Sequence, residues 1–80
     1  MKLPRDITGM ELARSLGRLG YSIDHQRGSH IRLTTTRGGE HHVTIPAHDP
    51  LKIGTLNAVL RDVGSHAHLE RAELLTLLFG

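Results

Sequence analysis

Two stretches of alternating residues, 30–35 and 41–45, constrain the fold of this chain more than any other feature. Apolar or small side chains alternate with polar ones, as Ile31, Leu33 and Thr35 against His30, Arg32 and Thr34, and as His41, Val43 and Ile45 against His42 and Thr44. This period of two is typical of strands with one buried face. The intervening RGGE, residues 37–40, is a hairpin signal.

The register of this hairpin follows from parity, because residues that face each other across an antiparallel pair lie on the same side of the sheet. Ile31 and Leu33 must therefore align with Val43 and Ile45. This parity predicts a three-residue loop within residues 37–40, with glycine in the left-handed position.

The same register gives His30 predicted neighbours. It places His30 opposite Pro46 or His48, so we expect His30 and His48 to lie close together. Arg32 and His42 are predicted to share the polar face of the sheet with His30, on the side away from the core.

A helix and a further strand are predicted before this hairpin. Thr8 and Glu11 have the spacing of a capping box, and a leucine stripe ended by Gly20 predicts a helix over residues 9–19. From Tyr21 the period changes to two, which predicts a first strand that ends at the Gly28-Ser29 turn. In this strand Tyr21, Ile23 and His25 are expected on one face, and Ser22, Asp24 and Gln26 on the other.

Two helices are predicted after the hairpin. Pro46 and Pro50 resist a continuing strand, so the third strand should end there. The next helix has Ile53, Leu56, Val59 or Leu60, and Val63 on its apolar side and is expected to stop at Gly64. A short terminal helix at about residues 69–78 should bury Leu74, Leu75, Leu77 and Leu78 as a lid on the core. The result is an α+β fold with helices on one face of a three-stranded antiparallel sheet.

Length and composition limit the class of protein. Eighty residues without cysteine predict a single domain over residues 1–80, stabilised by one apolar core and suited to a reducing cytoplasm. No apolar run resembles a signal peptide or a membrane span, so we expect a soluble, cytoplasmic protein with no membrane association. The formal charge is +2, and eight of the ten basic residues are arginine, which suits an anionic partner. Tyr21 and Phe79 are the only aromatics, so RNA binding would rely on backbone and shape rather than on stacking.

Seven histidines invite a metal-site interpretation, which their spacing does not support. Neighbouring strand residues point to opposite faces, so His41 and His42 cannot easily share one ion, and no cysteine completes a zinc set. We therefore expect no metal site. His41, His42, His66 and His68 are interpreted as partly exposed polar side chains.

His30 allows two interpretations when the residues are taken alone. It can be an exposed strand histidine without further role, or a proton-transfer group, because imidazole titrates near neutrality. Arg27, Arg32 and Lys52 could gather near it to hold a phosphate. At the start of the later helix, Gly54-Thr55 could bind a phosphate or simply cap the helix.

Several motifs together resemble those of a known family. The stretches LARSLGRLGYSIDHQRGSHIRL and VTIPAHDPLKIGTLNAVLRDVG contain, in order, a leucine-rich helix ending in Gly20-Tyr21, the triplet 28–30, the segment 45–48, and Gly54-Thr55-Leu56 opening a helix. This ordered set, over about residues 9–64, resembles the HicA toxin family of bacterial toxin–antitoxin systems, also called YcfA-like.

The resemblance implies a double-stranded-RNA-binding-like fold, which agrees with the predicted element order. It also implies an mRNA interferase, a metal-independent endoribonuclease without cofactor that arrests growth by cutting mRNA and is neutralised by a HicB-type antitoxin. The active-site histidine of the family corresponds to His30. The register suggests His48 as a second proton-transfer group, and the candidate substrate-binding residues are Gly28, Ser29, Arg27, Arg32 and Lys52. A non-enzymatic RNA-binding module, a domain that only engages a protein partner, and an inactive toxin remain alternatives.

Overall fold

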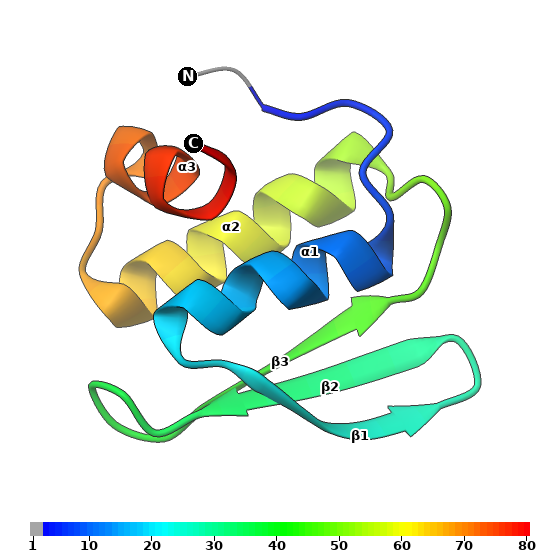
Figure 1. Cartoon of the computed structure of the whole chain (residues 1–80), viewed down its shortest axis with the longest axis horizontal. Coiled ribbons are helices and arrows are strands. Elements are labelled where there is room, and N and C mark those ends of the chain that lie inside the picture. The colour runs from blue at the N-terminus through cyan, green and yellow to red at the C-terminus, as the bar shows by residue number, and fades with distance from the viewer. Residues whose placement is uncertain (1–2) are drawn as a thin grey trace.

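The computed structural model describes residues 3–80 as one sheet covered by helices on a single face (Figure 1). The elements are α1 (Gly9–Leu16), the 3-10 turn η1 (Gly17–Leu19), β1 (Ser22–Arg27), β2 (His30–Thr35), β3 (His41–Pro46), α2 (Ile53–Ala67) and α3 (Arg71–Phe79). The strands are antiparallel in the order β1-β2-β3. Helices α1 and α2 lie on the sheet, and α3 packs over these two helices (Figure 1). The predicted α+β, double-stranded-RNA-binding-like layout is confirmed, including its additional C-terminal helix.

The capping box at the start of α1 is present as predicted. The amide of Glu11 donates to the Thr8 hydroxyl at 3.0 Å, and the Glu11 carboxylate accepts from the Thr8 amide at 2.9 Å. The α-helix ends at Leu16 and the 3-10 turn completes the predicted span to Leu19. Gly20 then takes φ 85°, a left-handed conformation that turns the chain into the sheet.

The predicted register of the central hairpin is confirmed, whereas the predicted loop length is wrong. Ile31 pairs with Ile45 and Leu33 with Val43, but pairing ends at Thr35 and His41 and leaves a five-residue loop, 36–40. The loop is longer because it forms its own turn, in which the Gly39 amide donates to the Thr36 carbonyl at 3.1 Å. The two loop glycines take positive φ values, as expected for this position.

Strand β1 departs from simple alternation at a β-bulge. Ile23 pairs with Leu33 and His25 with Arg32, so Asp24 is an extra residue without its own partner. The prediction that His25 lies on the same face as Ile23 is therefore wrong, because its partner Arg32 lies on the exposed face of β2. Gln26 likewise lies on the opposite face from the one predicted, since its partner is the buried Ile31.

Helix α2 continues beyond its predicted end. It passes Gly64 and ends at Ala67, where His68 takes φ 56° as the left-handed cap. Gly64 is instead buried where the following segment crosses α2, since a Cβ there would lie 3.3 Å from the Leu69 carbonyl oxygen. Two predicted core positions are also wrong, because Ile53 is 52% exposed at the first turn of α2 and Leu77 is 41% exposed on α3.

The core lies between the sheet and the helices. Its fully buried members come from every layer, namely Leu12, Leu16, Ile31, Leu33, Ile45, Leu56, Leu60, Val63, Leu74 and Leu78. The other face of the sheet has no helix over it among residues 3–80 (Figure 1). In this part of the chain, no helix is both long and apolar enough to cross a membrane.

The start of α1 fixes the segment that follows β3. The Gly9 amide donates to the His48 carbonyl at 2.9 Å, and the Leu51 amide donates to the Ile7 carbonyl at 2.8 Å. Gly9 is buried so closely on this segment that a Cβ would overlap the Pro46 carbonyl oxygen. The absence of a side chain at Gly9 therefore lets α1 approach the end of β3.

Gly9→Ala is expected to destabilise the protein by about 1–3 kcal/mol, because the methyl group forces α1 away from the end of β3. Gly17→Ala is the matched control, since Gly17 has helical φ and ψ and no atom within 4 Å of an added Cβ. It should be neutral or stabilising by up to about 1 kcal/mol. Urea denaturation measures both, and equal effects of the two substitutions would contradict this account.

Candidate functional site

His30 lies where the β1–β2 hairpin turns back into the central strand. The loop is the two residues Gly28 and Ser29, because Arg27 pairs with His30 across it. Gly28 takes φ 57° and Ser29 does not have a positive φ, the arrangement of a type II′ hairpin turn. His30 is therefore the first residue of β2, with Arg27 of β1 on one side and Pro46 of β3 on the other.

The side chain of His30 belongs to the uncovered face of the sheet. In β2 the residues His30 and Arg32 are exposed, while the alternating Ile31 and Leu33 are fully buried against the helices. This arrangement confirms the prediction that His30 and Arg32 share the polar face. An imidazole at this position is exposed to solvent.

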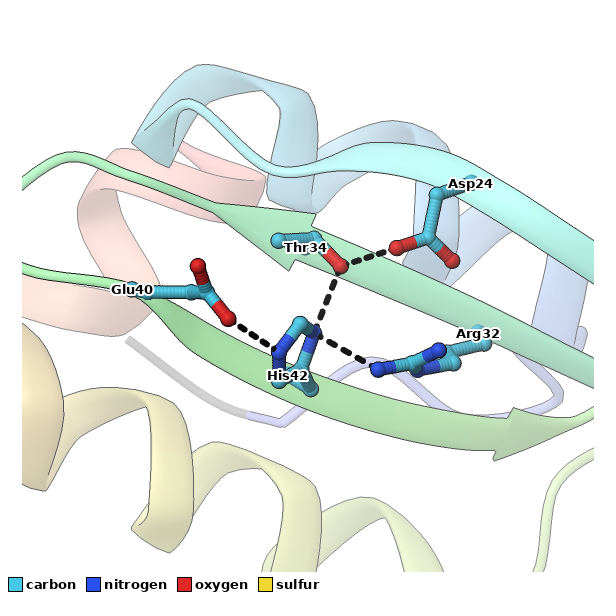
Figure 2. Close-up of polar contacts among 5 residues, drawn as sticks. All are labelled: Asp24, Arg32, Thr34, Glu40 and His42. Carbon is cyan, nitrogen blue, oxygen red and sulfur yellow. Dashed lines mark hydrogen bonds and ion pairs between the residues drawn. The ribbon is translucent and has the colours of Figure 1, made fainter.

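The middle of this open face carries a chain of polar contacts centred on His42 (Figure 2). Nδ1 of His42 lies 3.2 Å from Nη2 of Arg32 and 2.7 Å from the Thr34 hydroxyl, and Nε2 lies 2.9 Å from the Glu40 carboxylate. The Thr34 hydroxyl also donates to the Asp24 carboxylate. His42 thus connects the cationic Arg32 with two carboxylates on β1 and on the loop before β3.

The contacts of His42 depend on its protonation. The Glu40 carboxylate only accepts, so Nε2 of His42 carries a proton and Nδ1 can accept from Arg32 when the ring is neutral. When both nitrogens carry protons, Nδ1 can donate to the Thr34 hydroxyl oxygen and can no longer accept from Arg32. The hydrogen bond that holds the Arg32 guanidinium is therefore a property of neutral His42.

Charge is unevenly distributed along the open face. The end nearest the β1–β2 turn carries Arg27 paired with His30, and Arg32 two pairs further along. The two carboxylates, Asp24 and Glu40, lie toward the other end, in contact with Thr34 and His42 (Figure 2). Phosphate is therefore favoured at the His30 end and disfavoured at the Asp24 end.

Two of the predicted site residues, His48 and Lys52, are not part of the contacts on the open face of the sheet. The Ala47 amide donates to the Ser29 carbonyl at 2.6 Å, so pairing runs one residue beyond β3 and His48 follows it. No hydrogen bond joins His30 and His48 within residues 3–80, and their proximity stays a prediction. Lys52 is the exposed N-cap of α2, and it lines a surface hollow with Arg5 and Asp6 rather than the sheet.

The arrangement of the histidines does not suit a metal ion. Within the described residues no group of three or more histidine, cysteine, aspartate or glutamate side chains could hold one. His41 and His42 lie on opposite faces of β3, as predicted, with His41 in contact with Tyr21 and His42 with Arg32.

Comparison with known proteins identifies the family. A family model described as HicA toxin of bacterial toxin-antitoxin matches residues 9–65, from α1 to α2. The chain belongs to the HicA toxin family. Searches of curated proteins and of solved structures gave no match. The match includes all three strands and therefore the whole open face of this HicA domain.

A second histidine cluster of this HicA domain lies between sheet and helices. His41 contacts the Tyr21 hydroxyl through Nδ1 at 2.6 Å and the Asp62 carboxylate through Nε2 at 3.1 Å, and its side chain is only 20% exposed. Its ring also stacks on His66, with centroids 4.4 Å apart. His66 in turn contacts the Arg37 carbonyl through Nε2 at 3.0 Å, which ties the 36–40 loop to α2.

The sequence-based interpretation of His41 and His66 as partly exposed polar residues missed these contacts. The neutral state of His41 satisfies both partners, because Nε2–H donates to Asp62 while Nδ1 accepts from the Tyr21 hydroxyl. The residues come from the link between η1 and β1, from β3 and from α2, so no local spacing reveals them. The one available signal was the alternation of β3, which places His41 on the buried side of the sheet with Val43 and Ile45.

Burial raises the pKa of Tyr21 to about 12, and the negative charge of Asp62 adds to the effect. The unfolded chain ionises this phenol near its ordinary pKa of about 10, so the folded state loses stability as the pH rises from 10 toward 12. Tyr21→Phe should remove this part of the alkaline loss. At pH 7 it should cost about 0.5–1.5 kcal/mol for the lost hydrogen bond to His41.

Unfolding free energies of both proteins between pH 7 and pH 11.5 test this expectation. An equally steep alkaline loss in the phenylalanine variant would show that other groups cause it.

Proposed function

We propose that this HicA-family protein is an mRNA interferase, a metal-independent endoribonuclease that cuts mRNA in the cytoplasm and so arrests translation and growth. The observation that carries the proposal is the position of His30. It is exposed at the head of the central strand, on an uncovered sheet face, beside Arg27 and on the same face as Arg32.

The proposed reaction uses the ribose 2′-hydroxyl as nucleophile. A base must take the 2′-hydroxyl proton, cations must stabilise the charge that develops on the phosphate, and an acid must protonate the leaving 5′-oxygen. His30 provides one of the two proton transfers. Arg27 and Arg32 hold the phosphate through charge-assisted hydrogen bonds, and the Gly28-Ser29 turn leaves room for the backbone of the RNA.

The partner that we propose is a HicB-type antitoxin that neutralises the toxin by covering the open face. Family membership supports an antitoxin partner, and the uncovered polar face supports the site where it binds. Lys52 and His48 remain candidates from the sequence for phosphate binding and for the second proton transfer.

His30→Asn is expected to lower the rate of RNA cleavage by at least about 10²-fold, the typical contribution of a general acid or base. His68→Asn is the matched control. It removes an exposed imidazole from the end of α2, and asparagine tolerates the left-handed φ of 56° found there. Cleavage is measured with a defined RNA in the presence of EDTA, growth arrest is followed in a bacterial host, and circular dichroism confirms folding.

Two outcomes would contradict the proposal. A folded His30→Asn protein that cuts RNA at the wild-type rate would remove His30 from the reaction. Wild-type protein that binds RNA without cutting it would favour a non-enzymatic RNA-binding module instead.

Arg27→Gln should weaken the binding of single-stranded RNA and reduce the salt dependence of binding. Loss of one phosphate contact lowers the slope of log K against log salt concentration by about 0.7 for a single strand. Arg14→Gln is the control, because Arg14 is exposed on α1, away from the open face of the sheet. Binding titrations with the His30→Asn background at several salt concentrations measure both slopes, and equal slopes would contradict a phosphate contact at Arg27.

A further inference from the structure

The open face carries a second imidazole beside His30, put there by the β-bulge of β1. His25 is the partner of Arg32, and Arg27 is the partner of His30. Without the extra residue Asp24, simple alternation places His25 on the same side as Ile23, whose partner Leu33 is fully buried. Bulges often re-aim a side chain in this way next to active sites.

These four residues form a rectangle on the exposed face of two neighbouring strands. The two imidazoles occupy one diagonal and the two guanidinium groups the other, because His25 pairs with Arg32 and His30 with Arg27. Diagonal neighbours in an antiparallel pair are typically about 7–8 Å apart, so long side chains from both can reach one ligand. A phosphodiester held by Arg27 and Arg32 would thus lie between His25 and His30.

We propose that His25 is the second proton-transfer residue of the reaction, acting with His30 on one RNA phosphodiester. This inference rests on the proposed ribonuclease function. One imidazole takes the proton of the 2′-hydroxyl as the bond from the 2′-oxygen to phosphorus forms. The other imidazole gives a proton to the 5′-oxygen as the bond between phosphorus and that oxygen breaks. The products are a 2′,3′-cyclic phosphate and a 5′-hydroxyl, and no oxidant, reductant or metal is required.

The surroundings of His25 suit this role. The charged and titratable groups that face it are Arg27 and Asp24 on its own strand and His30 and Arg32 on β2, and no helix of the described chain packs on this side. Asp24 directly precedes His25 at the bulge, and its carboxylate accepts a hydrogen bond from the Thr34 hydroxyl (Figure 2). Nη2 of Arg32 lies 3.2 Å from Nδ1 of His42, so one of the two phosphate-binding groups already contacts a neighbouring side chain.

His48 is the competing candidate, and the backbone favours His25. His25 lies within a paired strand next to the partner of His30, whereas His48 follows the last paired residue in the segment that leaves the sheet. The His48 backbone is held by the Gly9 amide, but no strand pair of the described chain places its side chain beside His30 or a phosphate-binding arginine.

The first experiment is the pH dependence of kcat for cleavage of a defined RNA by the wild-type protein and by His25→Asn, His30→Asn, His48→Asn and His68→Asn. A base and an acid together give a bell-shaped profile. His25→Asn should lose one limb of the bell and about 10²–10⁴-fold in kcat with little change in KM. His68→Asn should keep the wild-type profile.

A substrate with a better leaving group separates the two roles. In a uridine 3′-(4-nitrophenyl phosphate), the nitrophenolate leaves without protonation, so loss of the acid has little effect on the rate. We expect one of the variants His25→Asn and His30→Asn to recover most of the wild-type rate on this ester while the other stays impaired. His25→Gln serves as a second variant, and circular dichroism confirms that both proteins are folded.

The inference is overturned if folded His25 variants keep both limbs of the profile and a rate close to wild type, or if the limb is lost in His48→Asn instead. Failure of the proposed function gives a different result, since wild-type protein would then cut neither substrate. Cleavage by the wild-type protein that depends on His30 but not on His25 would therefore contradict this inference alone.

Discussion

The antiparallel pairing of β2 with β3 is the interaction on which the rest of the structure depends. Ile31 and Leu33 are fully buried opposite Ile45 and Val43, so this register fixes which side of the sheet meets the helices. A slip by one residue would bring His30 and Arg32 into the core and expose the apolar set. The same apolar contacts that stabilise the fold therefore also hold the polar face open.

The two faces of β3 show how one strand serves stability and chemistry at once. His41 faces the helices and is held by Tyr21 and Asp62, while its neighbour His42 faces outward and orients Arg32. The two imidazoles therefore make their contacts on opposite sides of the sheet. The inner one ties the sheet to α2, and the outer one links the cationic and acidic ends of the open face (Figure 2).

The sequence predicted the features that follow from strong local patterns. The capping box of α1 and the register of the central hairpin depend on short spacings and on buried alternation, and both are confirmed. It missed the bulge at Asp24, because every residue of β1 is exposed and no apolar alternation reports its register. It also missed the end of α2, since Gly64 is required by packing beneath Leu69 rather than by a change in backbone direction.

Strand β1 is exposed along its whole length, which accounts both for its irregular register and for its part in the candidate site. A strand without buried side chains has no core contacts that fix its register, so a bulge in it costs little apolar burial. Edge strands also benefit from bulges, which twist the exposed backbone away from pairing with another chain. The extra residue at Asp24 thus serves the edge and, by the same local change, brings His25 next to Arg32. The tight Gly28-Ser29 turn connects β1 directly to β2. It therefore fixes the register of the pairs that lie between the turn and the bulge. The part of the sheet that is least constrained by the core is therefore the part where side chains can be arranged for a ligand.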